Sequence, residues 1–255
     1  MFRVNPIELV VALIAFCSVT SAATSSSATI FLDSNAVHQQ EAFTYGILST
    51  VAGSITGGGS TQNDVLATAA KLSNPLGITM DTSGNLYISD TNGHRIMKVT
   101  TSTGLITAVA GTGVAGYSGD GGEAINAKVN SPIGIKLDKS GNIYLADPAL
   151  HRIRKITVST GIITTVAGNG DNLYDKDKVA ATSTTLSSPK DVALDSDGNI
   201  YIADTYNNRK RKVIASTGII TTVAGNGTSN TNRLIGSVVA TANSVYGPVR
   251  IAVDK

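Results

Sequence analysis

Residues 132–170 read PIGIKLDKSGNIYLADPALHRIRKITVSTGIITTVAGNG, and an edited copy of this stretch stands both before and after it. The equivalent prolines Pro75, Pro132 and Pro189 are spaced 57 residues apart each time. A fixed period of this length is typical of architectures in which each repeat is one structural unit and neighbouring units complete one another's core. The sequence therefore predicts three full repeats with the same fold.

Each repeat contains four apolar runs separated by turn signals, which predicts four antiparallel strands. In the first repeat the runs are 77–81, 86–88, 94–99 and 105–110. A Ser-Gly or Asp-Gly pair joins the first two runs, and glycine permits the positive φ that tight hairpins need. The second run is apolar on consecutive residues, so both of its faces should be covered. Each repeat is therefore one small sheet that must pack on both sides.

Stacking such sheets around an axis buries both faces, which is the β-propeller architecture. We therefore predict an all-β chain, a β-propeller of four-stranded antiparallel blades. Residues 47–52 match only a fourth strand and 249–254 only a first strand, giving three full blades plus partial blades at both ends. Propellers typically have 4–8 blades. The expectation is an incomplete six-bladed ring from a truncated product, with an open arc that oligomerises as the alternative.

The repeated motifs resemble those of NHL repeats. They are Pro-x-Gly-Ile-x-x-Asp, Gly-Asn-Ile-Tyr-x-Ala-Asp, His-Arg-Ile-Arg-Lys and the Tyr-Ser-Gly-Asp-Gly-Gly segment at 117–122. The resemblance covers about residues 47–255 and implies a propeller, commonly six-bladed, that presents loops for binding. The third repeat departs from the pattern, with Asn208-Arg209-Lys210 in place of His-Arg-Ile and no Gly-Asp-Gly-Gly in its crossing segment.

The N-terminus has the pattern of a secretory signal. Arg3 precedes an apolar run from residue 7 to 19, and small residues follow up to Ala23, so residues 1–23 are predicted to be a cleaved signal peptide. A membrane anchor is the alternative, although the run is shorter than the roughly 20 residues a bilayer needs. Residues 24–46 are predicted to be a Ser/Thr-rich flexible segment, and 47–255 the propeller. The only cysteine, Cys17, would leave with the signal.

The charge balance does not favour a nucleic-acid partner. The formal net charge is +2, and 15% of the residues are charged. The third strands nevertheless carry a basic band, and we expect it to be a solvated outer edge rather than an RNA-binding face, with a polyanionic extracellular partner as the alternative. This band consists of Arg152, Arg154, Lys155, Arg209, Lys210, Arg211 and Lys212.

Several polar residues were weighed as ligands. Asp90, Asp147 and Asp204 end the second strands, and we expect them to bind their own turn backbone rather than a metal. His94 and His151 are equivalent, but the third repeat has Asn208, which makes a poor zinc site. The resemblance brings in metal-binding amidating-lyase relatives for comparison.

Two acidic stretches were also considered. Asp195-Ser196-Asp197-Gly198-Asn199 looks like the start of a calcium loop, but hairpin chemistry explains it equally well. Asp171, Asp175 and Asp177 are diluted by lysines and should form a solvated loop.

No nucleophile elbow, phosphate loop or catalytic triad order is present. We therefore predict no catalytic, cofactor or metal residues, and glycosylation at Asn226 in the sequon Asn226-Gly227-Thr228. The expected function is a secreted, extracellular module that binds or scaffolds a protein or glycan, without nucleic acid, and with a membrane only if residues 1–23 stay uncleaved.

The crossing segments 53–74, 111–131 and 168–188 differ most between repeats and should carry specificity. Two alternatives remain open. One is a metal-dependent lyase or hydrolase that uses the channel, and the other is an extracellular piece of a larger receptor.

Overall fold

The computed structural model describes residues 49–54, 63–174, 176–229 and 239–254. The predicted signal peptide 1–23 and the segment 24–46 lie outside these ranges. The chain divides into a unit up to Val51 and a second unit from Ala52 onward, and the fold described here belongs to the second unit. Within the described residues, no helix is both long enough and apolar enough to cross a bilayer.

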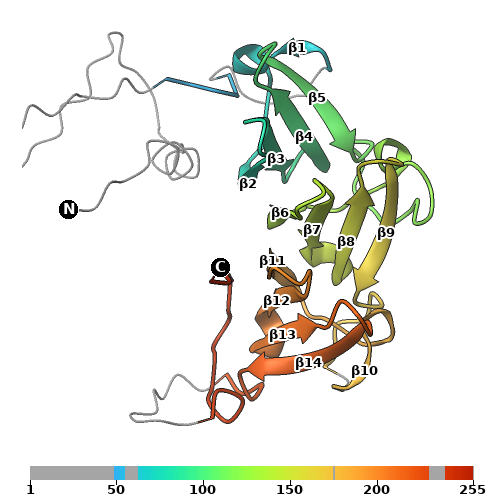
Figure 1. Cartoon of the computed structure of the whole chain (residues 1–255), viewed down its shortest axis with the longest axis vertical. Helices are drawn as coiled ribbons and strands as arrows, with labels where there is room; N and C mark the ends of the chain where they lie inside the picture. The colour runs from blue at the N-terminus through green and yellow to red at the C-terminus, as the bar shows by residue number, and fades with distance from the viewer. Residues whose placement is uncertain (1–48, 55–62, 175, 230–238, 255) are drawn as a thin grey trace, which may run out of the picture. The chain divides into compact units, whose positions relative to one another are not determined.

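Three antiparallel sheets follow one another along the chain, one for each predicted repeat (Figure 1). Each sheet runs in chain order from an inner first strand to an outer fourth strand. The strands of the first sheet are β2 (Pro75–Met80), β3 (Leu86–Asp90), β4 (Arg95–Thr100) and β5 (Leu105–Ala110). The second has β6 (Ile135–Leu137), β7 (Ile143–Asp147), β8 (Arg152–Thr157) and β9 (Ile162–Ala167). The third has β11 (Pro189–Leu194), β12 (Ile200–Asp204), β13 (Arg209–Val213) and β14 (Ile219–Ala224).

The prediction of four-stranded blades is confirmed, and the crossing segments add to it. The two-residue strands β1 (Val65–Leu66) and β10 (Val179–Ala180) pair outside β5 and β14. In the second sheet a single bridge between Glu123 and Ile162 takes the same place. Each crossing segment therefore covers the outer edge of the blade that follows it, which leaves less unpaired backbone at that edge.

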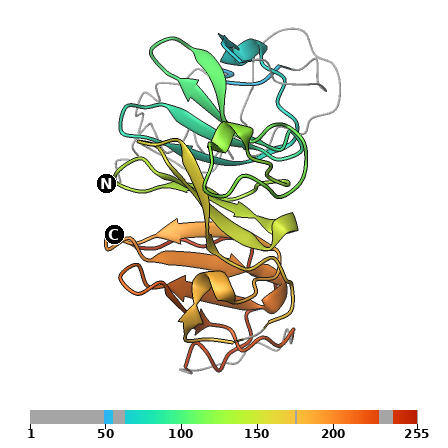
Figure 2. The same cartoon turned by 90° about the vertical axis from the view of Figure 1, so that its right-hand side faces the viewer.

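The interior lies between neighbouring sheets. One apolar cluster joins the first and second sheets through side chains such as Tyr87, Ile96, Ile135 and Leu145. A second joins the second and third sheets in the same way. All residues of β3 and β7 are buried, as expected for strands covered on both faces. Figure 2 shows the three sheets from the side of their outermost strands.

The strands predicted at both ends are not formed in the described residues. Residues 49–52 and 249–254 have no ladder partner there, and a strand exists only through such pairing. Ile251 instead packs against Ala193 and Ala203 of the third sheet, and its N–H donates to Asp191 Oδ2 at 3.0 Å. The number of blades in a complete ring stays a prediction.

Candidate functional site

The innermost strands line a cavity of about 390 Å³. Its walls come from β2, β6 and β11 and from the segment after Pro248, so residues far apart in the sequence meet there. The apolar lining is Ile78, Ile135, Ile251 and Ala252, and the polar lining includes Lys136, Asp191 and Arg250. A recess of this size, mostly apolar with a few charged groups, is typical of a small-molecule site.

The position two residues after the opening proline decides what reaches this cavity. It is Gly77, Gly134, Asp191 and Arg250 in successive repeats. A Cβ on Gly134 would lie 2.5 Å from the Asp191 carboxylate and 2.8 Å from the Lys190 carbonyl oxygen. Glycine is therefore required where one blade's first strand approaches the next. The repeat symmetry is broken where Asp191 and Arg250 place charged side chains.

Asp191 is almost completely buried at the edge of this cavity. Its carboxylate accepts the N–H of Ile251 at 3.0 Å, while burial raises the pKa of the Asp191 carboxyl against the lowering effect of that bond and of the charges on Arg250 and Lys136. Both cationic side chains are exposed. Arg250 Nη2 donates to the Leu76 carbonyl at 3.3 Å. The site thus combines one fixed acid with two accessible cations.

The second-strand aspartates bind the crossing segment that precedes their blade. Asp90 accepts the N–H of Ser73 at 2.5 Å, Asp147 that of Asn130 at 3.0 Å and Asp204 that of Ser187 at 2.7 Å. The expected structural use is present. The expected main partner was wrong, because the donor lies 17 residues earlier in each case rather than two residues later.

Burial raises the pKa of Asp147 to about 7, although the N–H of Asn130 and the charge of Arg154 act in the opposite direction. Burial also raises the pKa of Asp204, which accepts hydrogen bonds from Ser187 and Asn207.

His94 and His151 hold the start of the following blade. Nδ1 of His94 accepts the N–H of Ser131 at 3.1 Å, and Nδ1 of His151 accepts the N–H of Ser188 at 3.0 Å. In the third repeat Oδ1 of Asn208 accepts the N–H of Gly247 at 2.9 Å. All three acceptors have φ between 50° and 54°, where Asn and His are enriched. The two histidines do not form a pair; each belongs to a separate junction.

The basic band is not a solvated outer edge, and this prediction is corrected. Arg154 and Arg211 are completely buried. Their strands β8 and β13 lie third in each sheet, inside β9 and β14. The crossing segment folds over them and supplies acceptors. A buried guanidinium persists only when its charge and its N–H groups are satisfied in this way.

The Arg154 guanidinium is held by the segment 117–128. It forms an ion pair with Asp120 at 2.5 Å and donates to the carbonyls of Ser118 and Lys128 at 3.0 and 2.9 Å. Asp120 also accepts the N–H of Thr165 at 3.0 Å. Burial raises the pKa of Asp120, but its bonds to Thr165 and Arg154 outweigh this and lower the pKa overall.

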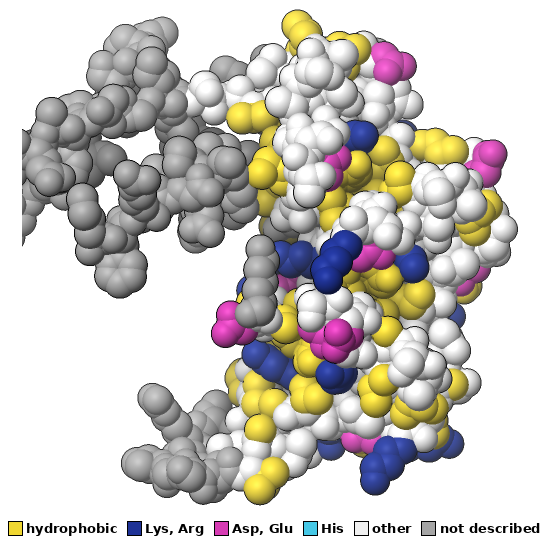
Figure 3. Space-filling view, viewed as in Figure 1, with side chains coloured by type: hydrophobic (Ala, Val, Ile, Leu, Met, Phe, Trp, Pro, Cys, Tyr) yellow, Lys and Arg dark blue, Asp and Glu magenta, His cyan; other side chains and the backbone are white. Residues whose placement is uncertain are grey.

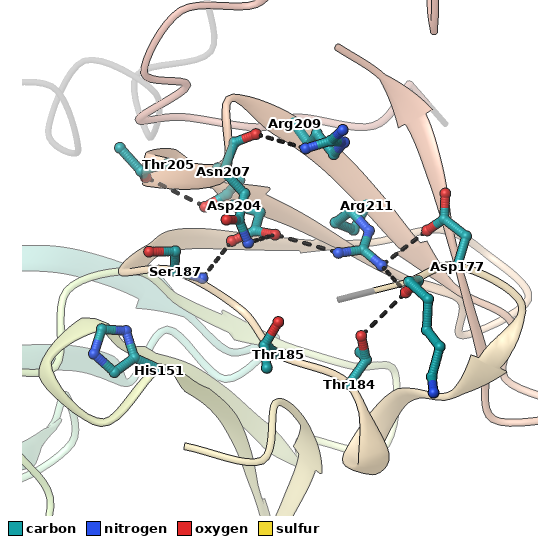
Figure 4. A network of polar contacts seen from close by, with 12 residues as sticks. His151, Asp177, Thr184, Thr185, Ser187, Asp204, Thr205, Asn207, Arg209 and Arg211 are labelled. Carbon is teal, nitrogen blue, oxygen red and sulfur yellow. Dashed lines mark hydrogen bonds and ion pairs between the residues drawn. The ribbon is translucent and has the colours of Figure 1, made fainter. Parts of the chain in front are cut away.

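The third blade repeats this arrangement (Figure 4). Arg211 pairs with Asp177 at 2.8 Å and with Asp204 at 3.4 Å. Arg209 lies over the ring of Tyr174, 3.7 Å from its centre, as Arg152 lies over Tyr117. The acidic loop is thus not simply solvated, because Asp177 is an anchor. Asp171 is exposed, and Asp175 lies outside the described residues.

The first blade has the same geometry without the charges. Met97 is completely buried in place of Arg154, and Asn63 takes the place of Asp120. Oδ1 of Asn63 accepts the N–H of Ala108 at 2.8 Å, as Asp120 accepts that of Thr165. The arginine and its acid are therefore exchanged together.

The loop that begins at Asp195 uses its carboxylate within the hairpin. Oδ1 accepts the N–H groups of Asp197 and Asn199 at 3.1 and 2.9 Å, and Oδ2 accepts Nδ2 of Asn199 at 2.8 Å. Asp81 and Asp138 make the same bonds. Across the described residues, no group of three or more His, Cys, Asp or Glu side chains converges as metal ligands would.

Asn226 lies on an exposed turn after β14. Its Oδ1 accepts the hydroxyl of Thr228 at 2.7 Å, and its Nδ2 donates to the Ala242 carbonyl at 3.1 Å. Glycosylation at this site stays a prediction.

The crossing segments expose apolar side chains although their backbones are anchored. Val114 is 56% exposed, Ile125 39% and Leu173 78%. The carbonyl of Leu173 accepts the Thr185 hydroxyl. On the face seen in Figure 3, basic and acidic side chains lie among one another rather than in separate regions.

Comparison with known proteins identifies the repeats. The model of the teneurin NHL domain matches residues 113–176, and the NHL repeat model matches residues 72–98 and 186–209. Teneurin-3 of Mus musculus is 36% identical over 140 residues, which are 48% of this chain and 5% of that protein. NHL repeat-containing protein 2 of Homo sapiens is 27% identical over 195 residues, 72% of this chain and 26% of that protein. The chain thus spans only a small part of these relatives.

Two solved structures were also found. A nutrient-binding protein of Bacteroides thetaiotaomicron matches with a TM-score of 0.47 and 21% identity, over 65% of this chain and 39% of that one. Virginiamycin B lyase of Staphylococcus aureus matches with a TM-score of 0.41 and 19% identity, over 60% of this chain and 43% of that one. With its repeat period, its four-stranded blades and the matching repeat models, the chain is a member of the NHL-repeat β-propeller family.

Proposed function

We propose that this chain is an extracellular module that binds or scaffolds a protein or glycan and has no catalysis of its own. The observation that carries the proposal is the contrast between rigid blades and variable crossing segments. Buried ion pairs hold these segments on the blades, and apolar side chains such as Val114 and Leu173 point into solvent. Ordered loops with exposed apolar groups on a fixed frame suit recognition of a partner.

Secretion is the second part of the proposal, and it rests on the pattern of residues 1–23. The intact mass of the protein released into the medium of a eukaryotic host tests it. We expect a chain that has lost residues 1–23, with a glycan that disappears in Asn226→Gln. Retention of an unprocessed chain in the cells would contradict secretion.

The binding role is tested with the full chain as bait against a panel of purified extracellular proteins and of sulfated and neutral glycans. The double variant Val114→Ser/Leu173→Ser should lose the partner that the wild type retains. Val158→Ser is the matched control, because Val158 is 49% exposed but lies on a hairpin turn after β8. Equal binding by both variants would contradict recognition through the crossing segments.

The alternative of a metal-dependent lyase or hydrolase is separated by metal analysis of the same purified protein. Stoichiometric zinc or calcium that survives dialysis would overturn the proposal of a non-catalytic module.

A further inference from the structure

We propose that the inner cavity binds a small organic monocarboxylate through Lys136 and Arg250. The site is distinct from the crossing segments and goes beyond the binding role proposed above. It lies where the repeat pattern is broken, and the break introduces charge rather than bulk alone.

The two cations approach the cavity from different blades. Lys136 follows Gly134 on β6, and Arg250 stands at the glycine position of the last repeat. Both are exposed and line the cavity. The Lys136 ammonium makes no hydrogen bond to any part of the chain that the structure describes. Arg250 uses one nitrogen, Nη2, on the Leu76 carbonyl. An arginine fork suits a planar carboxylate, which it can bind through two parallel N–H groups.

Asp191 fixes the charge of the ligand. It is buried beside the two cations, and its carboxylate is held by the N–H of Ile251. With Asp191 ionised, the three side chains sum to one positive charge, which a monoanion neutralises and a dianion exceeds. A like charge also approaches Asp191 at a cost, so a ligand with a single carboxylate fits better than a phosphate dianion.

The rest of the wall determines the body of the ligand. Ile78, Ile135, Ile251 and Ala252 present hydrocarbon around the cations. A compact apolar group next to the carboxylate would bury surface there, at about 25 cal/mol per Å² removed from water. The volume of about 390 Å³ lies at the lower end of the range for small-molecule pockets.

Cyclohexanecarboxylate is the probe, and its amide, cyclohexanecarboxamide, is the uncharged analogue of nearly equal shape. Binding to the full 255-residue chain is followed by calorimetry or by NMR titration. We expect the carboxylate to bind at least about tenfold more tightly than the amide, a difference of about 1.4 kcal/mol. Equal affinity of the two probes, or no binding at millimolar concentration, would overturn the proposal.

Variants assign the effect to the named side chains. Lys136→Gln and Arg250→Gln should each weaken carboxylate binding about tenfold. Asp191→Asn keeps an acceptor for Ile251 and should strengthen it. Lys139→Gln is the matched control, because Lys139 is an exposed lysine on the same hairpin and donates to Ser196 instead.

Lys136→Gln loses no hydrogen bond of the fold, so a weakened affinity there would not reflect unfolding; its thermal midpoint should equal that of the wild type. Inorganic phosphate tests the other source of anionic oxygens. Tighter binding of phosphate than of the carboxylate would overturn the assignment, and so would unchanged affinity in both glutamine variants.

Discussion

At the scale of single residues, one backbone task recurs at every blade junction. His94, His151 and Asn208 adopt the left-handed conformation and accept an N–H from the start of the next repeat. Imidazole Nδ1 and amide Oδ1 stand at similar reach from the backbone, so either side chain does the same work. The sequence difference between the repeats is therefore chemically conservative, and the histidines need no metal to account for them.

Exchange at His151 tests this equivalence. His151→Asn should change the free energy of unfolding by less than about 0.5 kcal/mol, because acceptor and backbone preference are both kept. His151→Ala should cost about 1–3 kcal/mol, because the Ser188 N–H loses its acceptor and alanine is strained at positive φ. Chemical denaturation measures both values. Equal destabilisation by Asn and Ala would show that the imidazole ring itself is needed.

Asp147 gives the fold an unusual pH dependence. Burial raises its pKa to about 7, whereas the carboxyl of an unfolded chain titrates near 3.8. Between these values the folded protein binds one proton more than the unfolded chain, so stability falls as the pH rises and levels off above about 7. Asp204 contributes with the same sign. Burial lowers the pKa of His151, which acts in the opposite direction below its ordinary value of 6.5.

The free energy of unfolding should therefore fall by about 1 kcal/mol between about pH 6 and pH 8. Asp147→Asn should show a smaller fall, because the titrating group is gone. Urea denaturation at several pH values gives both slopes. Parallel slopes for the two proteins would mean that Asp147 is ionised throughout this range.

At the scale of elements, the strands could be predicted and the crossing segments could not. The outer strands β5, β9 and β14 match the predicted runs from first to last residue. Alternation along β8 and β13 suggested exposed arginines, because nothing in a single strand says what covers it. A signal was nevertheless present. Asp120 and Asp177 recur 57 residues apart, as Arg154 and Arg211 do, and both kinds of residue are missing from the first repeat.

The inner cavity was missed for a similar reason. Its parts are separate single positions, Gly77, Gly134, Asp191 and Arg250, and only the folded arrangement brings them to one place. The change from glycine to charged residues at one repeat position was visible in the sequence, but its meaning depends on how closely neighbouring first strands approach.

The first blade serves as a natural model for removing the buried ion pair. Asp120→Asn alone leaves the Arg154 guanidinium buried without its counter-charge, and we expect a cost of about 3–5 kcal/mol. The double variant Asp120→Asn/Arg154→Met copies Asn63 and Met97 and should be at least about 1 kcal/mol more stable than Asp120→Asn alone.

The remaining loss in the double variant comes from the carbonyls of Ser118 and Lys128, which lose their donor. Arg154→Met alone completes the double-mutant cycle in denaturation experiments. Additive effects of the two single changes would contradict a coupled pair.

At the scale of the molecule, stability depends on how closely each inner strand approaches the next. The N–H of Gly134 donates to the Lys190 carbonyl at 3.0 Å, directly linking the second blade to the third. The two sheets also share an apolar cluster that includes Tyr144, Ile153 and Ile202. A repeat protein whose neighbours are joined in this way is stabilised largely through its interfaces, so damage at one junction is expected to uncouple the blades.

Gly134→Ala tests this coupling. The new methyl group would lie 2.6 Å from the Cα of Asp191 and 2.8 Å from the Lys190 carbonyl oxygen, and neither backbone atom can move away as a side-chain tip can. We expect a loss of at least about 2 kcal/mol, together with a broader unfolding transition as the blades separate. Gly122→Ala is the control, because its methyl group would meet only the Gly119 carbonyl oxygen at 3.4 Å and its backbone needs no positive φ. Calorimetry compares the two, and a single sharp transition for Gly134→Ala at the control's midpoint would show that the junction tolerates a wider spacing than its glycine implies.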